Sequence, residues 1–362
     1  MSKIYSIFTG TGSYVPTKQV KNESFLGNEF YKSAGEKITT PNEEVTRKFE
    51  EITTIAERRY AQDDESTSDL ALIAAQRAID AAGIDKEDLD YIIFAHNFGE
   101  TRPDNLAINI LPTLSSRLKQ KLGIANPFTV AYDTLFGCPG WIQAVIQADY
   151  YIRSGDAKKV LVVGADILSR ISDPHDRDSM IYADGAGAVV MEGVESDEPV
   201  GVIGHNSRTD ALEYSHLLFL GYSYDEGLAA KKDLYLKMNG RKLYMYALEN
   251  VPKTIKAGLD KLGLHINDVS KVLIHQANGK MDDAIISRLF KLYGIREVPE
   301  SIMPMTISWL GNSSVATVPT LLDMITRNNL ESHEICGGEN IVLASVGAGM
   351  NINSIIYRVP EK

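Results

Sequence analysis

Short apolar runs alternate along the chain with longer segments in which apolar residues recur at helical spacing. Residues 91–94, 160–163 and 272–274 form three of these short runs. Runs that are apolar throughout, rather than at every second position, are typical of strands buried on both faces of a sheet. The pattern therefore predicts an α/β fold in which mixed sheets are covered by helices on both sides.

The same helix-strand pattern occurs twice. In the first copy a helical segment ends at Gly83 and the strand 91–94 follows, and in the second the helix ends at Gly263 before the strand 271–274. Gly263 lies 180 residues after Gly83, and the two strands keep the same offset. Glycine commonly ends a helix in the left-handed conformation. The constant offset predicts one fold built from two similar halves, although any two α/β halves share part of this pattern.

A second pair of strands extends the repeat. Residues 160–164 and 341–345 are similar apolar runs, and each precedes a Gly-Ala-Gly sequence, at 185–187 and 347–349. We expect each Gly-Ala-Gly to form a turn that leads into a further strand.

The repeat sets the expected domain boundaries. We place an N-terminal half at residues 1–195 and a C-terminal half at residues 240–362. Residues 196–239 have their own turn signals and aromatic residues, so we expect an insertion or linker there.

Composition and charge limit the possible partners. The chain has 362 residues, of which 44% are hydrophobic and 23% charged, an average globular composition. Its net charge of −11 disfavours non-specific binding to nucleic acid. We find neither the residue order of a signal peptide nor an apolar run of the roughly 20 residues that span a bilayer. We therefore expect a cytoplasmic protein without membrane or nucleic-acid partners.

The chain has two cysteines, Cys138 and Cys336, which is too few for a disulfide framework or a zinc site, so no metal is expected. An apolar strand leads into Cys138 and a helical pattern follows, with Pro139 at the expected first helical position. The start of a helix carries partial positive charge and favours a thiolate, the nucleophilic form. The alternative is a buried structural cysteine. Cys336 is expected to be a bystander.

Two polar residues could work with such a nucleophile. His275 ends the strand 271–274, where the first half has Ala95. Asn312 follows an apolar stretch in the second half. Each has a simpler alternative, since a loop histidine can be satisfied by backbone groups and asparagine often caps a helix. His96, also at a strand end, is the best decoy.

A thiol, an imidazole and an amide together suggest acyl transfer through a covalent thioester. The imidazole and amide can donate hydrogen bonds to a carbonyl that becomes an enolate. Papain-like proteases use the same three residue types, and periodicity and spacing do not separate the two chemistries.

The ordered motifs resemble β-ketoacyl-acyl-carrier-protein synthase III, of the thiolase-fold condensing enzymes, over nearly the whole chain. The motifs are residues 10–16, the segment around Cys138, and residues 172–177, 182–188, 275–278, 311–316 and 347–349.

This resemblance implies a five-layer αβαβα fold made of two duplicated halves, a homodimer and a Cys-His-Asn triad. It implies decarboxylative Claisen condensation of an acyl thioester, from acyl-CoA or an acyl carrier, with malonyl-acyl-carrier protein, as in the initiation of fatty-acid synthesis. Cys138 would take the acyl group, while His275 and Asn312 hold the malonyl thioester carbonyl. The backbone N–H of Cys138 and one from Ala348 or Gly349 would form the oxyanion hole. Beyond these substrates no cofactor is implied.

The resemblance also implies sites for the carrier and its pantetheine arm. The residues expected to line the arm are Met238, Asn239, Gly240 and Asn278. An acidic carrier protein requires a local basic surface on this acidic chain. The expected docking residues are Arg241, Lys242, Lys253, Lys256 and Lys280, with ordinary solvated helix charge as the alternative.

Several residues depart from the family pattern. Phe136 and Trp141 stand near the nucleophile where small residues are usual, so we expect them to reshape the acyl pocket. The positions that sandwich the CoA adenine fall at about Lys48 and Ile52, which cannot stack in the same way. These departures support an alternative: a secondary-metabolite ketosynthase that joins a longer or unusual acyl group to a β-ketoacyl or malonyl thioester. A catalytically inactive scaffold is a third hypothesis, against which the intact triad argues.

Overall fold

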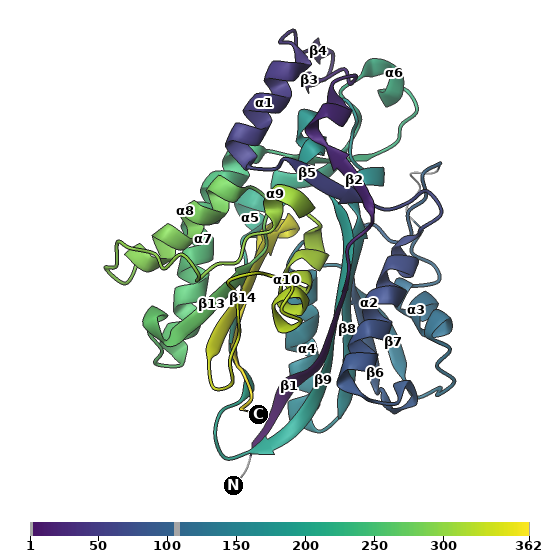
Figure 1. The fold of residues 1–362 in the computed structure, drawn as a ribbon. Helices are drawn as coiled ribbons and strands as arrows, with labels where there is room; N and C mark the ends of the chain where they lie inside the picture. The colour runs from purple at the N-terminus through teal and green to yellow at the C-terminus, as the bar shows by residue number, and fades with distance from the viewer. Residues whose placement is uncertain (1–2, 105–108, 362) are drawn as a thin grey trace.

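Two β-sheets form the framework of the computed structural model, which describes residues 3–104 and 109–361 (Figure 1). The first sheet has the strand order β1-β9-β8-β6-β7 and the second β10-β15-β14-β13. The strands of the first sheet are β1 (Lys3–Tyr14), β6 (Tyr91–Ala95), β7 (Val130–Thr134), β8 (Lys159–Ile167) and β9 (Asp184–Ser196). Those of the second are β10 (Gly201–Thr209), β13 (Val269–Ile274), β14 (Asn340–Gly347) and β15 (Asn351–Arg358).

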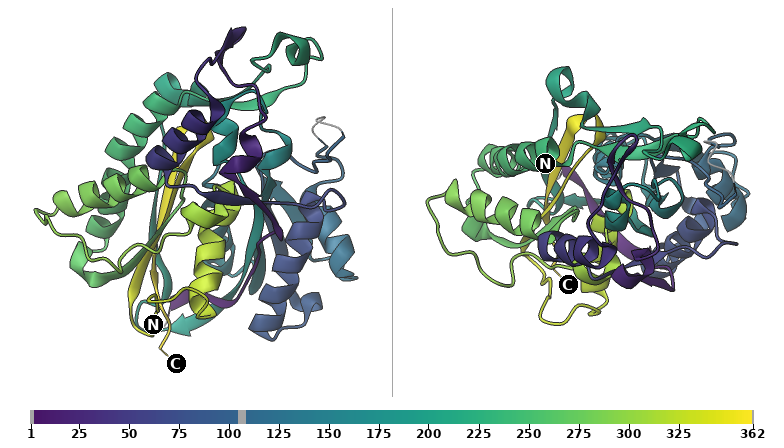
Figure 2. Two further views of the ribbon diagram at one scale, coloured as in Figure 1. Left: turned by 45° about the horizontal axis from the view of Figure 1, so that its top comes forward. Right: turned by 90° about the horizontal axis from the view of Figure 1, so that it is seen from above.

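Helices cover both sheets and also separate them, which gives five layers (Figures 1 and 2). The outer helices on the first sheet are α2 (Thr67–Ala82) and α3 (Leu114–Leu122), and those on the second are α7 (Gly240–Lys261) and α8 (Gly279–Lys291). Between the sheets lie α4 (Gly140–Ser154) and α10 (Thr317–Thr326). The central helices contact both sheets, α4 through β8 and β15 and α10 through β9 and β14. The expected αβαβα architecture is confirmed.

The two halves repeat the same topology. In each half a parallel pair, β6 with β8 or β13 with β14, continues into an antiparallel strand, β9 or β15. The helix-ending glycines Gly83 and Gly263 have φ of +65° and +67°, the left-handed conformation expected at both positions. The duplication predicted from the 180-residue offset is therefore present in the fold.

The segment 196–239 is only partly an insertion. Its first strand, β10, pairs with β15 and completes the second sheet, so this strand belongs to the C-terminal half. The rest of the segment lies outside the repeated core and contains α5 (Ala211–Tyr214), β11 (Leu218–Gly221), α6 (Glu226–Ala229) and β12 (Tyr235–Met238).

Further short elements gather at one end of the molecule, at the top of Figure 1. They are β2 (Lys18–Lys21), β3 (Tyr31–Ser33), β4 (Glu36–Lys37), α1 (Asn42–Thr53), β5 (Glu57–Tyr60) and α9 (Ile307–Leu310). The loop between β3 and β4 contacts the segment after β11, where the Gly35 N–H donates to the carbonyl of Tyr224 at 3.0 Å. Among the described helices none has the length and apolar character needed to cross a membrane.

The two Gly-Ala-Gly sequences have different roles, contrary to the expectation of two turns. Residues 347–349 do turn, and Gly349 has φ of +82°. Residues 185–187 instead lie inside β9. A Cβ on Gly187 would lie 2.7 Å from Cβ of Pro319, so glycine is needed there because the strand touches α10. Close packing of strand against helix thus produces the same sequence as a turn.

This contact can be tested by adding one methyl group. We expect Gly187→Ala to lower the free energy of unfolding by about 1–3 kcal/mol, the usual cost of overpacking. At Gly27 a Cβ would meet no atom within 4 Å, so Gly27→Ala is the matched control. Urea titration followed by circular dichroism measures both variants; equal stability of the two would contradict the proposed packing constraint.

Candidate active site

A cavity of about 1160 Å³ brings together Cys138, His275 and Asn312. Its other lining residues come from both halves and from the short elements at the top of the molecule. Lys48 and Ile52 of α1 lie at its exposed rim, so the two positions expected near a CoA adenine do border the cavity.

Cys138 lies between the first sheet and a central helix. The strand β7 ends at Thr134 and α4 begins at Gly140, with Pro139 as the residue that precedes the helix. The helix therefore starts one residue later than expected. Gly137 has φ of +69°, and a Cβ there would lie 2.6 Å from the backbone nitrogen of Ala348. This position requires glycine, because two backbone segments meet beside the nucleophile.

The turn after β14 forms the other side of that contact. A Cβ on Gly347 would lie 2.5 Å from the backbone nitrogen of Cys138, and Ala348 lines the cavity. The structure thus brings together Cys138 and Ala348 of the expected oxyanion hole. Gly349 instead faces Asn351, whose Nδ2 would lie 2.9 Å from a Cβ there.

His275 follows β13 directly, and its backbone N–H donates to the carbonyl of Ala344 at 2.9 Å. The side chain lines the cavity but is buried from bulk solvent. Burial lowers the pKa of His275 to about 4, and a hydrogen bond with the backbone of Ser314 partly opposes this shift. The imidazole is therefore neutral near pH 7 and can donate one N–H.

Asn312 is held by backbone pairing with the other half of the molecule. Its N–H donates to the carbonyl of Ile181 at 3.0 Å, and the N–H of Ala183 donates to its carbonyl at 2.8 Å. Its side-chain Oδ1 accepts from the N–H of Ser314 at 2.8 Å. This bond leaves the amide NH₂ as the polar group available to a ligand, so local backbone capping and a role in the cavity coexist.

The Cys138 thiol is protonated before substrate binds. Burial raises the pKa of Cys138 to about 11, and the nearby Asp166 carboxylate acts in the same direction, while a hydrogen bond from Ser314 lowers it. We expected the start of α4 to favour the thiolate, but desolvation of the sulfur outweighs the favourable contacts in the substrate-free site.

The expected pantetheine residues Met238, Asn239, Gly240 and Asn278 all line the cavity. Two of them also start helices. Asn239 accepts from the N–H of Lys242 at 3.4 Å at the start of α7, and Asn278 from that of Met281 at 3.1 Å at the start of α8. Both helices therefore begin at the cavity.

The two bulky neighbours of Cys138 do not line the cavity, contrary to our expectation. Trp141 is 1% exposed and packs in the core between the sheets, where its ring centroid lies 6.3 Å from that of Phe8. The Trp141 side chain lies against Gly164, where a Cβ would be 3.2 Å from Cβ and Cδ1 of the tryptophan. Phe136 is half-buried outside the lining, and its carbonyl accepts from Nδ2 of Asn351 at 3.5 Å.

The expected docking residues separate into two groups. Arg241 lines the cavity, and Lys242 and Lys280 lie in the first turns of α7 and α8. Lys253 and Lys256 lie further along α7, paired with Glu249 at 2.9 Å and Asp260 at 2.7 Å. Lys253 and Lys256 therefore make ordinary ion pairs on the solvated face of the helix and do not belong to the cavity rim.

Three residues near the sulfur were missed at the sequence level. Asn97 follows β6, Asp166 lies near the end of β8, and Ser314 comes two residues after Asn312. Polar residues at the ends of neighbouring parallel strands are a usable signal, because those ends border ligand sites.

His96, the alternative histidine at a strand end, forms a hydrogen bond with Asp133 at 2.9 Å and has a structural role. Within residues 3–104 and 109–361, we find no metal-binding cluster of His, Cys, Asp and Glu.

Comparisons with known proteins agree with this geometry. The model of 3-oxoacyl-(acyl-carrier-protein) synthase III matches residues 132–211, and the model of its C-terminal part matches residues 259–359. The chain is 32% identical to β-ketoacyl-(acyl-carrier-protein) synthase III of Ehrlichia canis (strain Jake) over 356 residues, 98% of this chain and 99% of the relative.

Two solved structures extend the similarity. One is β-ketoacyl-(acyl-carrier-protein) synthase III of Thermus thermophilus, with 28% identity, a TM-score of 0.78 and coverage of 97% of this chain and 98% of that chain. The other is the priming β-ketosynthase of the R1128 polyketide pathway, with 26% identity, a TM-score of 0.79 and coverage of 99% and 97%.

Proposed function

The chain belongs to the 3-oxoacyl-(acyl-carrier-protein) synthase III family, and we propose that Cys138, His275 and Asn312 carry out its condensation. The enzyme is an acyltransferase of the condensing type. It joins an acyl thioester to malonyl-acyl-carrier protein with loss of CO₂, the reaction that initiates fatty-acid synthesis. The observation that carries the assignment of residues is the convergence of these three side chains on one cavity.

The first half-reaction transfers the acyl group to Cys138. The sulfur attacks the thioester carbonyl, and the backbone N–H groups of Cys138 and Ala348 stabilise the oxyanion that forms. The carbon-sulfur bond to the donor breaks, and the thiol proton leaves with the departing thiolate. The packing of Gly347 against Cys138 supports this role, because it brings the two backbone segments into contact.

The second half-reaction uses His275 and Asn312. The neutral imidazole and the Asn312 amide donate hydrogen bonds to the malonyl thioester carbonyl. Breaking the bond to CO₂ moves its electrons into an enolate, which those bonds stabilise. The enolate carbon then attacks the acyl-Cys138 carbonyl, and the Cys138 thiolate leaves and is reprotonated. The low pKa of His275 supports the role of a hydrogen-bond donor that stays uncharged.

The two half-reactions can be separated by substitution. We expect Cys138→Ala to abolish acyl loading, because the attacking atom is gone. Asn312→Ala should still load the acyl group but lose condensation by about 100-fold, the usual effect of removing one oxyanion donor. Intact-mass spectrometry measures loading, and product formation from malonyl-carrier measures condensation. Failure of Asn312→Ala to load would contradict its assignment to the second step.

The alternative function is a secondary-pathway ketosynthase for a longer or unusual acyl group. The positions of Lys48 and Ile52 at the cavity rim support it, as does the similarity to the R1128 priming ketosynthase. The loading measurement with a panel of acyl-CoA and acyl-carrier donors decides between the two. A preference for acetyl-CoA favours initiation of fatty-acid synthesis, and a preference for longer or carrier-bound groups favours the alternative.

We further propose that the carrier protein docks at the rim of the cavity where α7 and α8 begin. Arg241 and Lys280 are exposed there, and helix N-termini add partial positive charge suited to the phosphate of the arm. Lys256 lies 16 residues after Gly240, which corresponds to about 24 Å along the helix. It is therefore a control for this site rather than a member of it.

Charge reversal tests the docking surface. We expect Arg241→Glu with Lys280→Glu to raise KM for malonyl-carrier about tenfold, because rim charges steer the encounter. Loading from a small carrier-free thioester should change little. Lys253→Glu with Lys256→Glu is the matched control with the same charge change, because both lysines lie further along α7. An equal rise in KM for this control would contradict the assignment of the docking surface to the rim.

We also propose that the enzyme is a homodimer that works in the cytoplasm. Among the described strands β7 pairs only with β6, so its other edge is free to pair with a second copy. Exposed apolar residues stand on β7 or next to it in sequence: Phe128, Val130 and Leu135 are 84%, 47% and 60% exposed, and Leu111, before α3, is 78% exposed. The two cysteines are free, which fits a reducing compartment.

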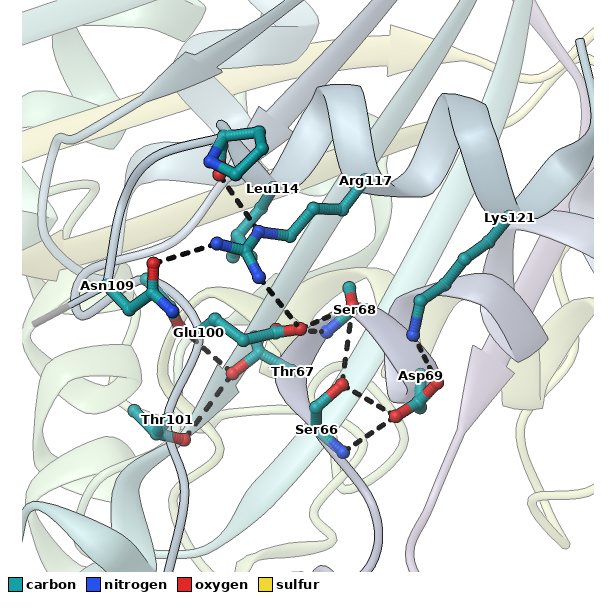
Figure 3. Close-up of polar contacts among 12 residues, drawn as sticks. Ser66, Thr67, Ser68, Asp69, Glu100, Thr101, Asn109, Leu114, Arg117 and Lys121 are labelled. Carbon is teal, nitrogen blue, oxygen red and sulfur yellow. Dashed lines mark hydrogen bonds and ion pairs between the residues drawn. The ribbon is translucent and has the colours of Figure 1, made fainter. Parts of the chain in front are cut away.

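A polar network links Asn109, Arg117 and Glu100 in front of α3 (Figure 3). The guanidinium of Arg117 donates to Oδ1 of Asn109 at 2.8 Å and to the carbonyl of Leu111 at 3.1 Å, and lies 3.7 Å from Glu100. Glu100 in turn accepts from the N–H of Ser68 at 2.9 Å, at the start of α2. The exposed leucine is therefore fixed by the folded core, as an interface residue would be.

Sedimentation velocity tests the dimer. We expect the wild-type protein to sediment as a dimer and Val130→Lys with Leu135→Lys to sediment as a monomer, because buried like charges would oppose pairing. Leu212→Lys is the control, since Leu212 is 98% exposed on α5. A monomeric wild type, or a double variant that stays dimeric, would refute this interface.

A further inference from the structure

A line of hydrogen bonds reaches the sulfur of Cys138 from inside the first sheet. The Asn97 N–H donates to Oδ1 of Asp166 at 2.8 Å, and Asn97 Nδ2 donates to Oδ2 of the same carboxylate at 2.8 Å. The same Nδ2 lies 3.0 Å from Oγ of Ser314. The Ser314 Oγ lies 3.5 Å from Sγ of Cys138, within the range for a hydrogen bond to sulfur.

The donor and acceptor groups determine where the protons lie along this line of hydrogen bonds. An amide nitrogen can only donate, and its two hydrogens are directed to Asp166 and to Ser314. The Ser314 oxygen must therefore accept from Asn97, and its single proton remains for another acceptor. The sulfur lies within hydrogen-bond distance, so the line can end in a donor aimed at the nucleophile.

The position of Ser314 is strongly constrained. Its N–H is bound to Oδ1 of Asn312 at 2.8 Å, and its φ is +55°, a left-handed value for a residue other than glycine. Such backbone strain persists only where the surroundings impose it, often at a functional site. Ser314 and Asp166 are 3% and 1% exposed, so water has little access to replace these bonds.

We propose that Ser314 is a further catalytic residue, which donates a hydrogen bond to the Cys138 sulfur, and that Asn97 and Asp166 are positioning residues for it. This inference rests on the assignment of Cys138 as the nucleophile. The bond is worth most when the sulfur is a thiolate, because a hydrogen bond to a charged acceptor is stronger than one to a neutral thiol. Ser314 thus favours the form that attacks the acyl donor, and the same form when it leaves after condensation.

Asp166 has two opposing effects on the sulfur. It anchors Asn97, which fixes the direction of the Ser314 hydroxyl, but its negative charge raises the pKa of Cys138. Burial raises the pKa of Asp166, and an interaction with the Ser314 hydroxyl is among the contacts that oppose this shift, so the serine proton has two acceptors within reach. Asn97 already donates one hydrogen bond to each oxygen of the Asp166 carboxylate. A thiolate is a stronger acceptor than a neutral thiol, so ionisation of Cys138 favours the bond from Ser314 to the sulfur.

The pH dependence of Cys138 alkylation by iodoacetamide tests the proposal. In a Cys336→Ser background only Cys138 can react, and below its pKa the rate is proportional to the thiolate fraction. We expect Ser314→Ala to slow alkylation about tenfold at a given pH, the loss of one hydrogen bond to a charged acceptor. Asn97→Ala should slow it in the same direction. Asp166→Asn should speed it, because the repelling charge is removed.

The matched control is Ser313→Ala, which removes the neighbouring hydroxyl. That hydroxyl bonds Oγ1 of Thr317 at 3.2 Å, and we expect its loss to leave the alkylation profile unchanged. An unchanged profile for Ser314→Ala, or equal slowing by Ser313→Ala, would overturn the proposal.

The failure of this inference is distinguishable from failure of the nucleophile assignment. If Cys138→Ala in the same background retained specific acyl loading, the assignment of the nucleophile would fall. If loading required Cys138 but Ser314→Ala had the parental profile, only the role of Ser314 would fall. If Asp166→Asn does not fold, as judged by circular dichroism, the comparison of Ser314→Ala and Asn97→Ala with Ser313→Ala decides.

Discussion

Backbone pairing between the two halves is the constraint on which the cavity depends. Asn312 belongs to the second half, yet both of its backbone groups bond to Ile181 and Ala183 of the first. Gly347 also packs so closely on Cys138 that neither Gly137 nor Gly347 has room for a side chain. These contacts bring thiol, amide and imidazole to one space although Cys138 and Asn312 are far apart in sequence. Side chains alone, with their rotamer freedom, could not hold the same geometry as well.

Burial of the side chains decides the electrostatics of the site. Burial lowers the pKa of His275 and raises that of Cys138, so both groups are neutral in the substrate-free enzyme. A neutral imidazole suits hydrogen-bond donation to a carbonyl, whereas a neutral thiol must lose its proton to react. Burial therefore helps the second half-reaction and opposes the first. Hydrogen-bond donors beside the sulfur counteract this effect by stabilising the thiolate, because a hydrogen bond is electrostatically stronger inside a protein than in water.

Much of the fold could be predicted from the sequence, because the same helix-strand pattern occurs in both halves of the chain. The offset between Gly83 and Gly263 predicted the duplicated halves, and both glycines have the expected left-handed conformation. The motifs around Cys138, His275 and Asn312 identified the residues that the structure brings together.

Other features depend on contacts between distant segments, which sequence patterns do not record. Trp141 packs in the core between the two sheets, and its neighbours there come from both halves of the chain. Gly187 stands in a sequence that resembles a turn, but glycine is needed there because α10 approaches the strand. The role of Asn97 depends on neighbours from β8 and from the second half, which only the fold assembles.

The duplication also explains where the supporting residues come from. The equivalent helices α4 and α10 both begin at the cavity, and they follow Cys138 in one half and Asn312 with Ser314 in the other. The equivalent strands β6 and β13 end beside it, where Asn97 and His275 follow. Within each pair of equivalent elements, one carries a reacting group and the other a group that orients or activates another. A symmetric fold thus provides the framework, and divergence of the two halves provides the chemistry. A single half could not supply it, because Cys138 comes from the first half and His275, Asn312 and Ser314 come from the second.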